Sequence, residues 1–449
     1  MKLTKRNTLR ALVAALPALF AACGGSDDYD TSAPLSCSVA DQKAWLGSYM
    51  DDWYFWYGIS PRPNPSVYSS VDDYFYALLY TGTSASFPAD RWSYTQSTEA
   101  FERFYGAGQT LGYGVSVAGM EVSGQPSQPL YVRYVESLSG AAGRVFRGDR
   151  VVSINGVTAS ALITADDYGV LSPSSAGQQI TMVVRDTADV DHTVTLTASV
   201  FSLTPVPTSS VVTTTLGGKM GYVVVKDMID QVNAPLETAF AQFKAAGISD
   251  VVLDLRYNGG GLVSVGGTVA SYVAGTRGSG HTYASLLYND KRANAYNQSF
   301  RFAVPSSAAG VSRVFVLAGP RTCSASEQVI NGLRGIGVTV VAIGDTTCGK
   351  PVGFLPESAC GTTYSAVNFE SVNEDNEGRY FDGFAPTCAV AEDFTSPLGS
   401  ATEPLLGAAR DYADFGSCPL APTASALALK PKAQRGRVEA GERQGMLGR

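Results

Sequence analysis

Short apolar runs alternate with helical patterns in the second half of the chain. The runs at 250–256, 314–318 and 338–343 have the length and composition of buried strands. Segments 262–273 and 324–334 place apolar or small residues at helical spacing. A strand, a crossover helix and a second strand form a right-handed unit with parallel strands. The pattern therefore predicts an α/β core whose strand-exit loops share one sheet edge, the edge at which ligands bind in such sheets.

Two other patterns precede this core. Residues 36–105 are rich in aromatic side chains, with the run Trp53-Tyr-Phe-Trp-Tyr57 at their centre, and their spacing suits short amphipathic helices packed as a bundle. From about 106 to 203 the pattern changes to short alternating strands. We therefore predict an N-terminal helical domain, a β-rich domain and an α/β core at 204–420. The aromatic run is interpreted as core packing, with an aromatic wall along a substrate path as the alternative.

The two ends of the chain differ from its middle in composition. Four Lys or Arg residues and the apolar stretch at 11–22 are typical of an export signal that is too short to span a bilayer. The end of this stretch, Leu19-Phe-Ala-Ala-Cys23, resembles a bacterial lipobox, which implies a lipid on Cys23; an ordinary secretory signal is the alternative. Residues 23–35 then form a flexible tether. The last residues, 421–449, are predicted to be a disordered basic tail.

The predicted lipid on Cys23 determines the expected location of the protein. Gly24 follows Cys23, and no aspartate is present there to suggest retention at the inner membrane. We therefore expect a protein of the bacterial cell envelope, anchored through lipid on Cys23 in the outer membrane rather than the inner one.

Composition excludes several function classes. The chain is 45% hydrophobic and 16% charged, which favours a globular protein over a disordered one. Its net charge is −7 and its body has no basic stripe, so we expect no nucleic-acid partner. No C-x-x-C motif or His-Cys cluster offers a zinc site, and we expect no metal or cofactor.

Three strand exits carry complementary chemistry. The first is followed by the glycine triplet 259–261, the second by Ser324 and the third by Lys350. A hydroxyl nucleophile, an amine that takes its proton and backbone N–H groups that hold an oxyanion are the parts of an acyl-transfer site. The amine must be neutral to act, so burial must lower the pKa of Lys350 by about 3 units from its ordinary value.

Each part also has an ordinary interpretation. Ser324-x-x-Glu327 fits a helix capping box, the glycines fit a flexible turn, and a single lysine is usually solvated. Gly344 to Lys350 fits most of a phosphate-binding loop, but Pro351 stands where that motif needs Ser or Thr. A serine–histidine pair with His281 is a further alternative, and His192 lies in the β-rich region.

The motifs around these residues resemble those of the C-terminal processing (tail-specific) serine peptidases. Asp254-Leu-Arg-Tyr-Asn-Gly-Gly-Gly261, Cys323-Ser-Ala-Ser-Glu327 and Gly344-Asp-Thr-Thr-Cys-Gly-Lys350 match three family segments in order. The resemblance implies Ser324 as nucleophile and Lys350 as general base of a Ser-Lys dyad. It implies an oxyanion hole from the amides of Ala325 and Gly260, with a latitude of one residue for the glycine. Many relatives carry a glutamine where this chain has Phe354.

The β-rich region resembles a PDZ domain of the bacterial protease type. Gly112-Tyr113-Gly114-Val115 is the candidate carboxylate-binding loop. Such a domain adds a peptide strand to its sheet edge and captures a terminal carboxylate with backbone amides. The resemblance thus implies an endopeptidase for exported or unfolded proteins, with polypeptide partners held by their C-terminal segments. A peptide-binding surface lipoprotein that has lost catalysis is the alternative, and a β-rich spacer is the alternative for the PDZ-like region.

Besides Cys23 the chain has six cysteines, an even number that suggests disulfides in an exported protein. Cys323 precedes the serine and Cys348 lies two residues before the lysine, so we predict a bridge between these two. Proximity in the sequence favours Cys360 with Cys388, and elimination then leaves Cys37 with Cys418. Free buried thiols are the alternative.

Overall fold

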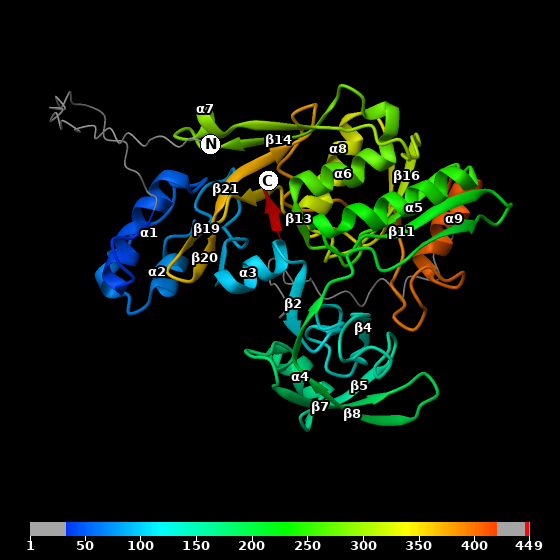
Figure 1. Ribbon diagram of the computed structural model, residues 1–449, viewed down its shortest axis with the longest axis horizontal. Coiled ribbons are helices and arrows are strands. Elements are labelled where there is room, and N and C mark those ends of the chain that lie inside the picture. The colour runs from blue at the N-terminus through cyan, green and yellow to red at the C-terminus, as the bar shows by residue number, and fades with distance from the viewer. Residues whose placement is uncertain (1–32, 420–444, 449) are drawn as a thin grey trace, which may run out of the picture. The chain divides into compact units, whose positions relative to one another are not determined.

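The computed structural model describes residues 33–419 and 445–448 (Figure 1). The expected mixture of helices and strands is confirmed: a region with helices is followed by several sheets and by helices that pack against them. Among the described residues, none belongs to a helix with both the length and the apolar character that a membrane span requires.

Some predictions fall on residues that the structure does not describe. The signal peptide at 1–22, the lipid attachment at Cys23 and most of the tether lie outside the described residues, as does most of the basic tail at 421–449. The structure does not test these predictions.

The N-terminal region is joined to the core by strand pairing. It consists of α1 (Val39–Trp53), η1 (Pro65–Val67), α2 (Val71–Ala77), β1 (Tyr94–Ser97) and α3 (Thr98–Tyr105). The three α-helices begin after serines whose side chains accept an N–H of the first turn, Ser38, Ser70 and Ser97. Tyr54 and Trp56 are fully buried, so core packing is confirmed for them. Strand β1 pairs antiparallel with β20 (Thr362–Ser365), a strand that the expected helical bundle did not include.

The β-rich region has an apolar interior of its own. Its elements are β2 (Gln109–Gly112), β3 (Val115–Val117), η2 (Met120–Val122), β4 (Val132–Val135), β5 (Arg150–Ile154), β6 (Val157–Thr158), α4 (Ala159–Ala165), η3 (Gly169–Leu171), β7 (Gln179–Arg185), β8 (Asp191–Thr197) and β9 (Ser199–Ser202). Strands β6, β5, β7 and β8 form one antiparallel sheet, and β3 with β4 and β2 with β9 form two pairs. Alternating residues such as Val194 and Leu196 point inward. The Arg321 guanidinium joins this region to the core through two contacts of 2.8 Å with the Glu121 carboxylate.

The core is built on a mostly parallel sheet. Its strands, in spatial order, are β10 (Ser209–Thr213), β11 (Lys219–Val224), β12 (Asp250–Asp254), β16 (Arg313–Ala318), β17 (Thr339–Gly344) and β22 (Cys388–Ala389). All pairs from β11 to β22 are parallel, which confirms the predicted parallel arrangement of the three apolar runs. The carboxyl ends of β12, β16 and β17 therefore meet at one edge.

Helices cover both faces of this sheet (Figure 1). Helices α5 (Asn233–Ala246), α6 (Val263–Ala274) and α8 (Ala325–Gly335) share one apolar cluster, and α9 (Pro404–Phe415) belongs to another. The division follows from the two-residue period of a strand: Val251 and Leu253 lie in the first cluster and Val252 lies in the second. Because both faces are covered, the strands read as continuous apolar runs in the sequence.

A second sheet contains the end of the chain. Its order is β13 (Gly260–Leu262), β23 (Gly445–Leu447), β18 (Val352–Phe354), β21 (Val367–Val372), β14 (Thr282–Tyr288) and β15 (Gln298–Arg301). The remaining elements are η4 (Asp230–Val232), η5 (Gly275–Gly278), α7 (Ala293–Tyr296) and β19 (Glu357–Ala359). The expectation of disorder up to residue 449 is wrong for 445–448, because two apolar side chains, Met446 and Leu447, fill a gap in this sheet and are fully buried there.

One of the three predicted disulfides is confirmed and two are wrong. Cys323 is bonded to Cys348 as expected, but Cys37 pairs with Cys360 and Cys388 with Cys418. Sequence proximity misled the other pairing because Cys360 follows β19, in the sheet that contains β1, whereas Cys388 lies in β22 at the edge of the parallel sheet.

Candidate active site

Ser324 ends the loop that leaves β16 and immediately precedes α8. Its φ angle is 64°, in the left-handed region that non-glycine residues seldom adopt. The side chain is fully buried, and its hydroxyl has no hydrogen-bond partner among the described residues. Buried hydroxyls are normally bonded, and strained backbone of this kind gathers at functional sites. Both observations single out Ser324 as a candidate functional residue.

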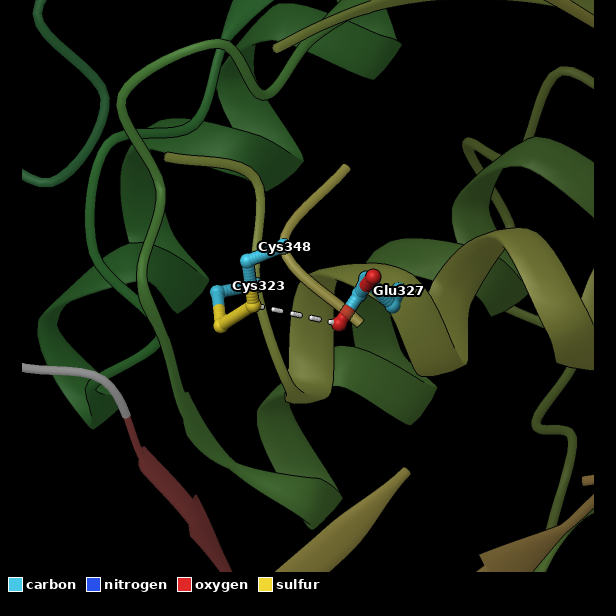
Figure 2. Close-up of side chains that lie close together, drawn as sticks. All are labelled: Cys323, Glu327 and Cys348. Atoms are coloured by element: carbon cyan, nitrogen blue, oxygen red, sulfur yellow. Dashed lines mark hydrogen bonds between the residues drawn. A yellow bond between two sulfur atoms is a disulfide. The ribbon is translucent and has the colours of Figure 1, made fainter. Parts of the chain in front are cut away.

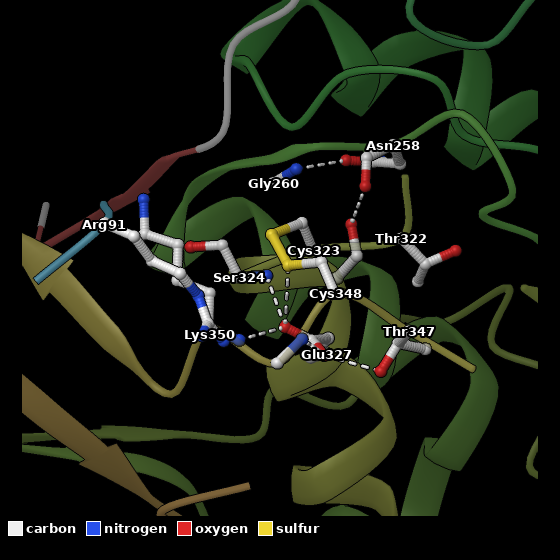
Figure 3. Close-up of a disulfide and its surroundings, with 12 residues drawn as sticks. Arg91, Asn258, Gly260, Thr322, Cys323, Ser324, Glu327, Thr347, Cys348 and Lys350 are labelled. Carbon is white, nitrogen blue, oxygen red and sulfur yellow. Dashed lines mark hydrogen bonds between the residues drawn. A yellow bond between two sulfur atoms is a disulfide. The ribbon is translucent and has the colours of Figure 1, made fainter. Parts of the chain in front are cut away.

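The carboxylate of Glu327 connects the serine to the lysine loop, which we define as residues 345–350. It accepts N–H groups from Ser324 at 2.9 Å, from Gly349 at 2.8 Å and from Lys350 at 2.8 Å, and it also accepts the Thr347 hydroxyl (Figure 3). Burial raises the pKa of Glu327, and these hydrogen bonds offset part of that shift. The glutamate half of the expected capping box is thus formed, but the serine hydroxyl makes no bond to the first turn of α8.

The disulfide between Cys323 and Cys348 makes a second connection between the same two loops (Figure 2). The Cα atoms of the two cysteines are 5.2 Å apart, and the N–H of Cys348 donates to the carbonyl of Thr322 at 3.1 Å. Cys348 Sγ also lies 3.5 Å from Glu327 Oε2. A disulfide sulfur has no proton to donate and no charge to offer a metal ion. The bond between Cys323 and Cys348 is therefore a covalent crosslink beside the serine.

Lys350 lies wholly inside the protein, with an exposed fraction of 0%. Burial lowers the pKa of its amine to about 7, and the carboxylates of Asp90 and Glu327 oppose part of that shift. The amine nitrogen lies 3.9 Å from the centroid of the Phe354 ring. Asp90 belongs to the N-terminal region, where it accepts hydrogen bonds from Tyr54 and Ser93. The N-terminal region thus contributes charge to the lysine site.

Asn258 holds the glycine triplet against the serine loop. Its side chain donates to the carbonyl of Val225 at 2.9 Å and accepts the N–H of Gly260 at 2.8 Å. Its own carbonyl accepts the N–H of Cys323 at 3.1 Å and the hydroxyl of Ser326 at 2.9 Å. A Cβ on Gly260, whose φ is 105°, would stand 3.0 Å from the amide nitrogen of Ala325. The structure therefore brings Gly260 and Ala325 together, with the N–H of Gly260 donated to Asn258.

The first motif is anchored to the last helix of the core. Arg256 forms two hydrogen bonds with the carboxylate of Glu403, at 2.8 and 3.0 Å, and lies 2.9 Å from that of Asp254. All three side chains are buried. Glu403 also accepts the N–H groups of Leu405 and Leu406 as the cap of α9. The Asp-Leu-Arg segment thus positions the glycine triplet through an internal ion-pair network.

The candidate carboxylate-binding loop lines a cavity of about 710 Å³ that reaches the glycine triplet. Gly112, Tyr113, Gly114 and Val115 lie on its wall, together with Gly259. Strand β3, which begins at Val115, is paired only with β4 within the described ranges. Val115 and Ser116 of this strand line the cavity.

Sequence analysis did not predict three contributors to the lysine and serine site, and it offered alternative sites that the structure does not form. Asp90, the bonding role of Glu327 and the ring contact of Phe354 were not foreseen; only the S-x-x-E spacing signalled Glu327. His281 pairs with Glu374 and His192 with Asp186, and both imidazoles are about half exposed, unlike Ser324. Lys350 is buried against Phe354, so its amine is not exposed to bind a phosphate, and the alternative of a phosphate-binding loop is not formed.

Comparisons with known proteins place this site in a family. The model described as "Peptidase family S41" matches residues 219–372, and "Peptidase S41 N-terminal domain" matches 41–94. A search of curated proteins found no match.

Solved structures share the fold. A structure assigned as an S41 protease from Bacteroides fragilis NCTC 9343 has 23% identity and a TM-score of 0.63, covering 82% of this chain and 96% of its own. The photosystem II D1 C-terminal processing protease has 18% identity and a TM-score of 0.50, covering 79% of this chain and 94% of its own. The matched regions contain the glycine triplet, the serine, the lysine and the N-terminal aspartate described above, and residues 41–94 and 219–372 are therefore domains of peptidase family S41, in a serine-type peptidase.

Proposed function

We propose that the chain is an endopeptidase in which Ser324 is the nucleophile and Lys350 the general base. The observation that carries the proposal is that the loops bearing a buried, unbonded serine hydroxyl and a buried lysine with a pKa of about 7 are held by one carboxylate, that of Glu327. Two backbone N–H groups that bond the same oxygen of Glu327 belong to neighbouring loops. A lysine with that pKa is largely uncharged just above neutral pH, the state that a general base requires.

The reaction is acyl transfer. The Ser324 hydroxyl attacks the carbonyl carbon of the scissile peptide bond while neutral Lys350 accepts the hydroxyl proton. The protonated amine then donates that proton to the leaving nitrogen, and an acyl-enzyme remains. Water hydrolyses the ester with Lys350 again as base, which regenerates the serine.

The N-terminus of α8 supplies the electrostatic stabilisation. Ala325 is the first residue of that helix, where backbone N–H groups lack intrahelical partners. An oxyanion formed at a carbonyl beside Ser324 faces this amide and the positive end of the helix dipole. In the described state Gly260 donates its N–H to Asn258, so its role as second donor requires that bond to be exchanged on substrate binding.

Substrates are recognised in the β-rich region. The loop Gly112–Val115 and Gly259 share one cavity, so a polypeptide held by its terminal carboxylate at the loop can continue toward the catalytic residues. The export signal and Cys23 support a location in the cell envelope, as a lipid-anchored protein of the outer membrane. Its substrates are then exported or unfolded polypeptides.

A single comparison tests the dyad. The purified protein, its Ser324→Ala variant and a Ser264→Ala control are incubated with an unfolded protein, and fragments are followed by mass spectrometry. Ser264 is an exposed residue of α6, so its variant should cleave as the native chain does. We expect cleavage to be lost only in Ser324→Ala. Equal and negligible cleavage by all three would favour a peptide-binding lipoprotein instead.

A further inference from the structure

The last strand of the chain occupies a gap in the second sheet. Strand β23 pairs in parallel with β13 on one side and with β18 on the other. Its ends are fixed by two further bonds, from the N–H of Gly445 to the carbonyl of Gly259 and from the N–H of Gly448 to that of Phe354, each at 3.1 Å. Within the described residues nothing else fills this gap, which we call the strand groove.

The strand groove is bordered by the catalytic segments. β13 begins within the glycine triplet, and β18 begins two residues after Lys350. The carbonyl oxygen of Gly445 and the amide nitrogen of Ala325 both lie within 3.0 Å of one point, the position of a Cβ on Gly260. Phe354, whose carbonyl accepts from Gly448, carries the ring that contacts the Lys350 amine. A chain in this groove therefore runs past both proposed catalytic residues.

The side chains of β23 fit the groove closely. Met446 and Leu447 are fully buried. A Cβ on Gly445 would stand 2.6 Å from the Tyr105 hydroxyl, and one on Gly448 would meet Phe369, Leu286 and Tyr288 at 3.1 to 3.2 Å. The groove thus accepts two apolar residues flanked by two very small ones. Backbone pairing on both sides with pockets for alternate side chains is the way in which an added strand is recognised.

The same strand helps to close the site. Ser324 and Lys350 are both completely buried, so in this state no polypeptide can reach the hydroxyl. Strand β23 can leave without breaking the parallel sheet, because β12, β16 and β17 pair independently of it.

We propose that Gly445–Gly448 is an intramolecular competitive inhibitor that occupies the peptidase's own substrate groove. The inference rests on the proposed function and extends it: the groove is assigned to polypeptide segments with a small, apolar, apolar, small pattern, and the chain's own end is one of them.

Truncation tests the proposal. The full chain is compared with a chain that ends at Gln444, using an internally quenched peptide substrate. We expect kcat/KM to rise at least fivefold through a lower KM, with kcat within twofold. An unchanged or smaller kcat/KM in a folded truncated chain would overturn the proposal.

A paired substitution covers the case in which truncation prevents folding. Met446→Asp/Leu447→Asp places two charges in the apolar pockets and should raise kcat/KM as truncation does. Leu427→Asp/Leu429→Asp makes the same chemical change in the tail outside β23 and should have no effect. Equal effects of the two pairs would contradict the assignment of the groove.

Binding separates this proposal from the proposed function. A fluorescent Gly-Met-Leu-Gly-Arg peptide should bind the truncated Ser324→Ala chain at least fivefold more tightly than the full-length Ser324→Ala chain, by fluorescence anisotropy, and Gly-Asp-Asp-Gly-Arg should not bind. This difference can persist even if neither active chain cleaves anything, in which case only the peptidase proposal fails. Equal affinities, or inhibition that disappears on dilution of the full chain, would refute the intramolecular inhibitor.

Discussion

The amine nitrogen of Lys350 lies over the face of the Phe354 ring, 3.9 Å from its centroid. The resembled family commonly places a glutamine at this position, where it orients the lysine by hydrogen bonding. Here an aromatic face takes that place, because a ring attracts a cation by about 0.5 to 2 kcal/mol. The ring thus favours protonated lysine and opposes the burial that lowers the pKa of Lys350. Phe354 therefore need not signal a lost activity.

The lowered pKa of Lys350 predicts the pH dependence of cleavage. Because the neutral amine is the active form and burial lowers the pKa of Lys350 to about 7, kcat/KM should rise about tenfold per pH unit at low pH and level off above pH 7 to 8. Initial rates from pH 5 to 9 measure this rise, which we call the acid limb of the pH profile. A midpoint of the acid limb near pH 10, the ordinary pKa of lysine, would show that the amine is solvated in the working enzyme.

Phe354→Leu should move that limb to lower pH. Removal of the ring takes away a contact that favours the protonated amine, so the pKa of Lys350 should fall, by up to about one unit. Phe369→Leu is the matched control, since Phe369 is also fully buried, on the neighbouring strand β21. The control should leave the limb where it is. A shift to higher pH in Phe354→Leu would mean that the ring acts mainly by excluding water.

Lys350→Met should stabilise the folded protein while abolishing cleavage. The pKa of Lys350 is lowered from 10.5 to about 7 on folding, so between these values the unfolded chain binds a proton that the folded chain lacks. The free energy of unfolding therefore rises with pH across this window. At pH 7 the buried lysine costs on the order of 4 kcal/mol, which methionine avoids. Urea unfolding should show a gain that is large at pH 7 and shrinks toward pH 10; an equal gain at both would contradict the shift.

Two disulfides of similar span should differ in their effect on catalysis. Cys323 and Cys348 are 25 residues apart and Cys388 and Cys418 are 30 apart, so the loss of either bridge should lower the free energy of unfolding by about 3 kcal/mol. Only the first joins the serine to the lysine loop. The double alanine variant of Cys323 and Cys348 should lose at least tenfold in kcat, and that of Cys388 and Cys418 should keep it. Equal losses in kcat would show that the bridge beside Ser324 acts on stability alone.

Gly114→Ala should weaken recognition of a terminal carboxylate. A Cβ on Gly114 would stand 1.9 Å from Ser139 Oγ, so the loop must shift. Gly143 has a similar φ, 73° against 81°, but nothing lies near its Cβ position, so Gly143→Ala carries the same backbone strain without the clash. KM for a substrate with a free C-terminus should rise toward that of its amidated form in Gly114→Ala only. No difference between the two variants would place substrate recognition elsewhere.

The sequence predicted the parallel core well because each buried strand is a continuous apolar run and each loop motif follows one directly. It could not show Asp90 near Lys350, since that approach depends on β1 pairing with β20 across more than 260 residues. The pairings of Cys37 and Cys388 failed for the same reason: they follow the placement of sheet edges. Strand β23 was not predicted, because two apolar residues among glycines and charged residues give no periodic signal. Its partners are β13 and β18, which only the folded structure brings to either side of it.

The pairing of Arg256 with Glu403 sets the order in which the enzyme can mature. The two residues are 147 positions apart, so during synthesis the guanidinium is produced long before its carboxylate partner. Until α9 has been made, the loop that carries Gly260 lacks this anchor.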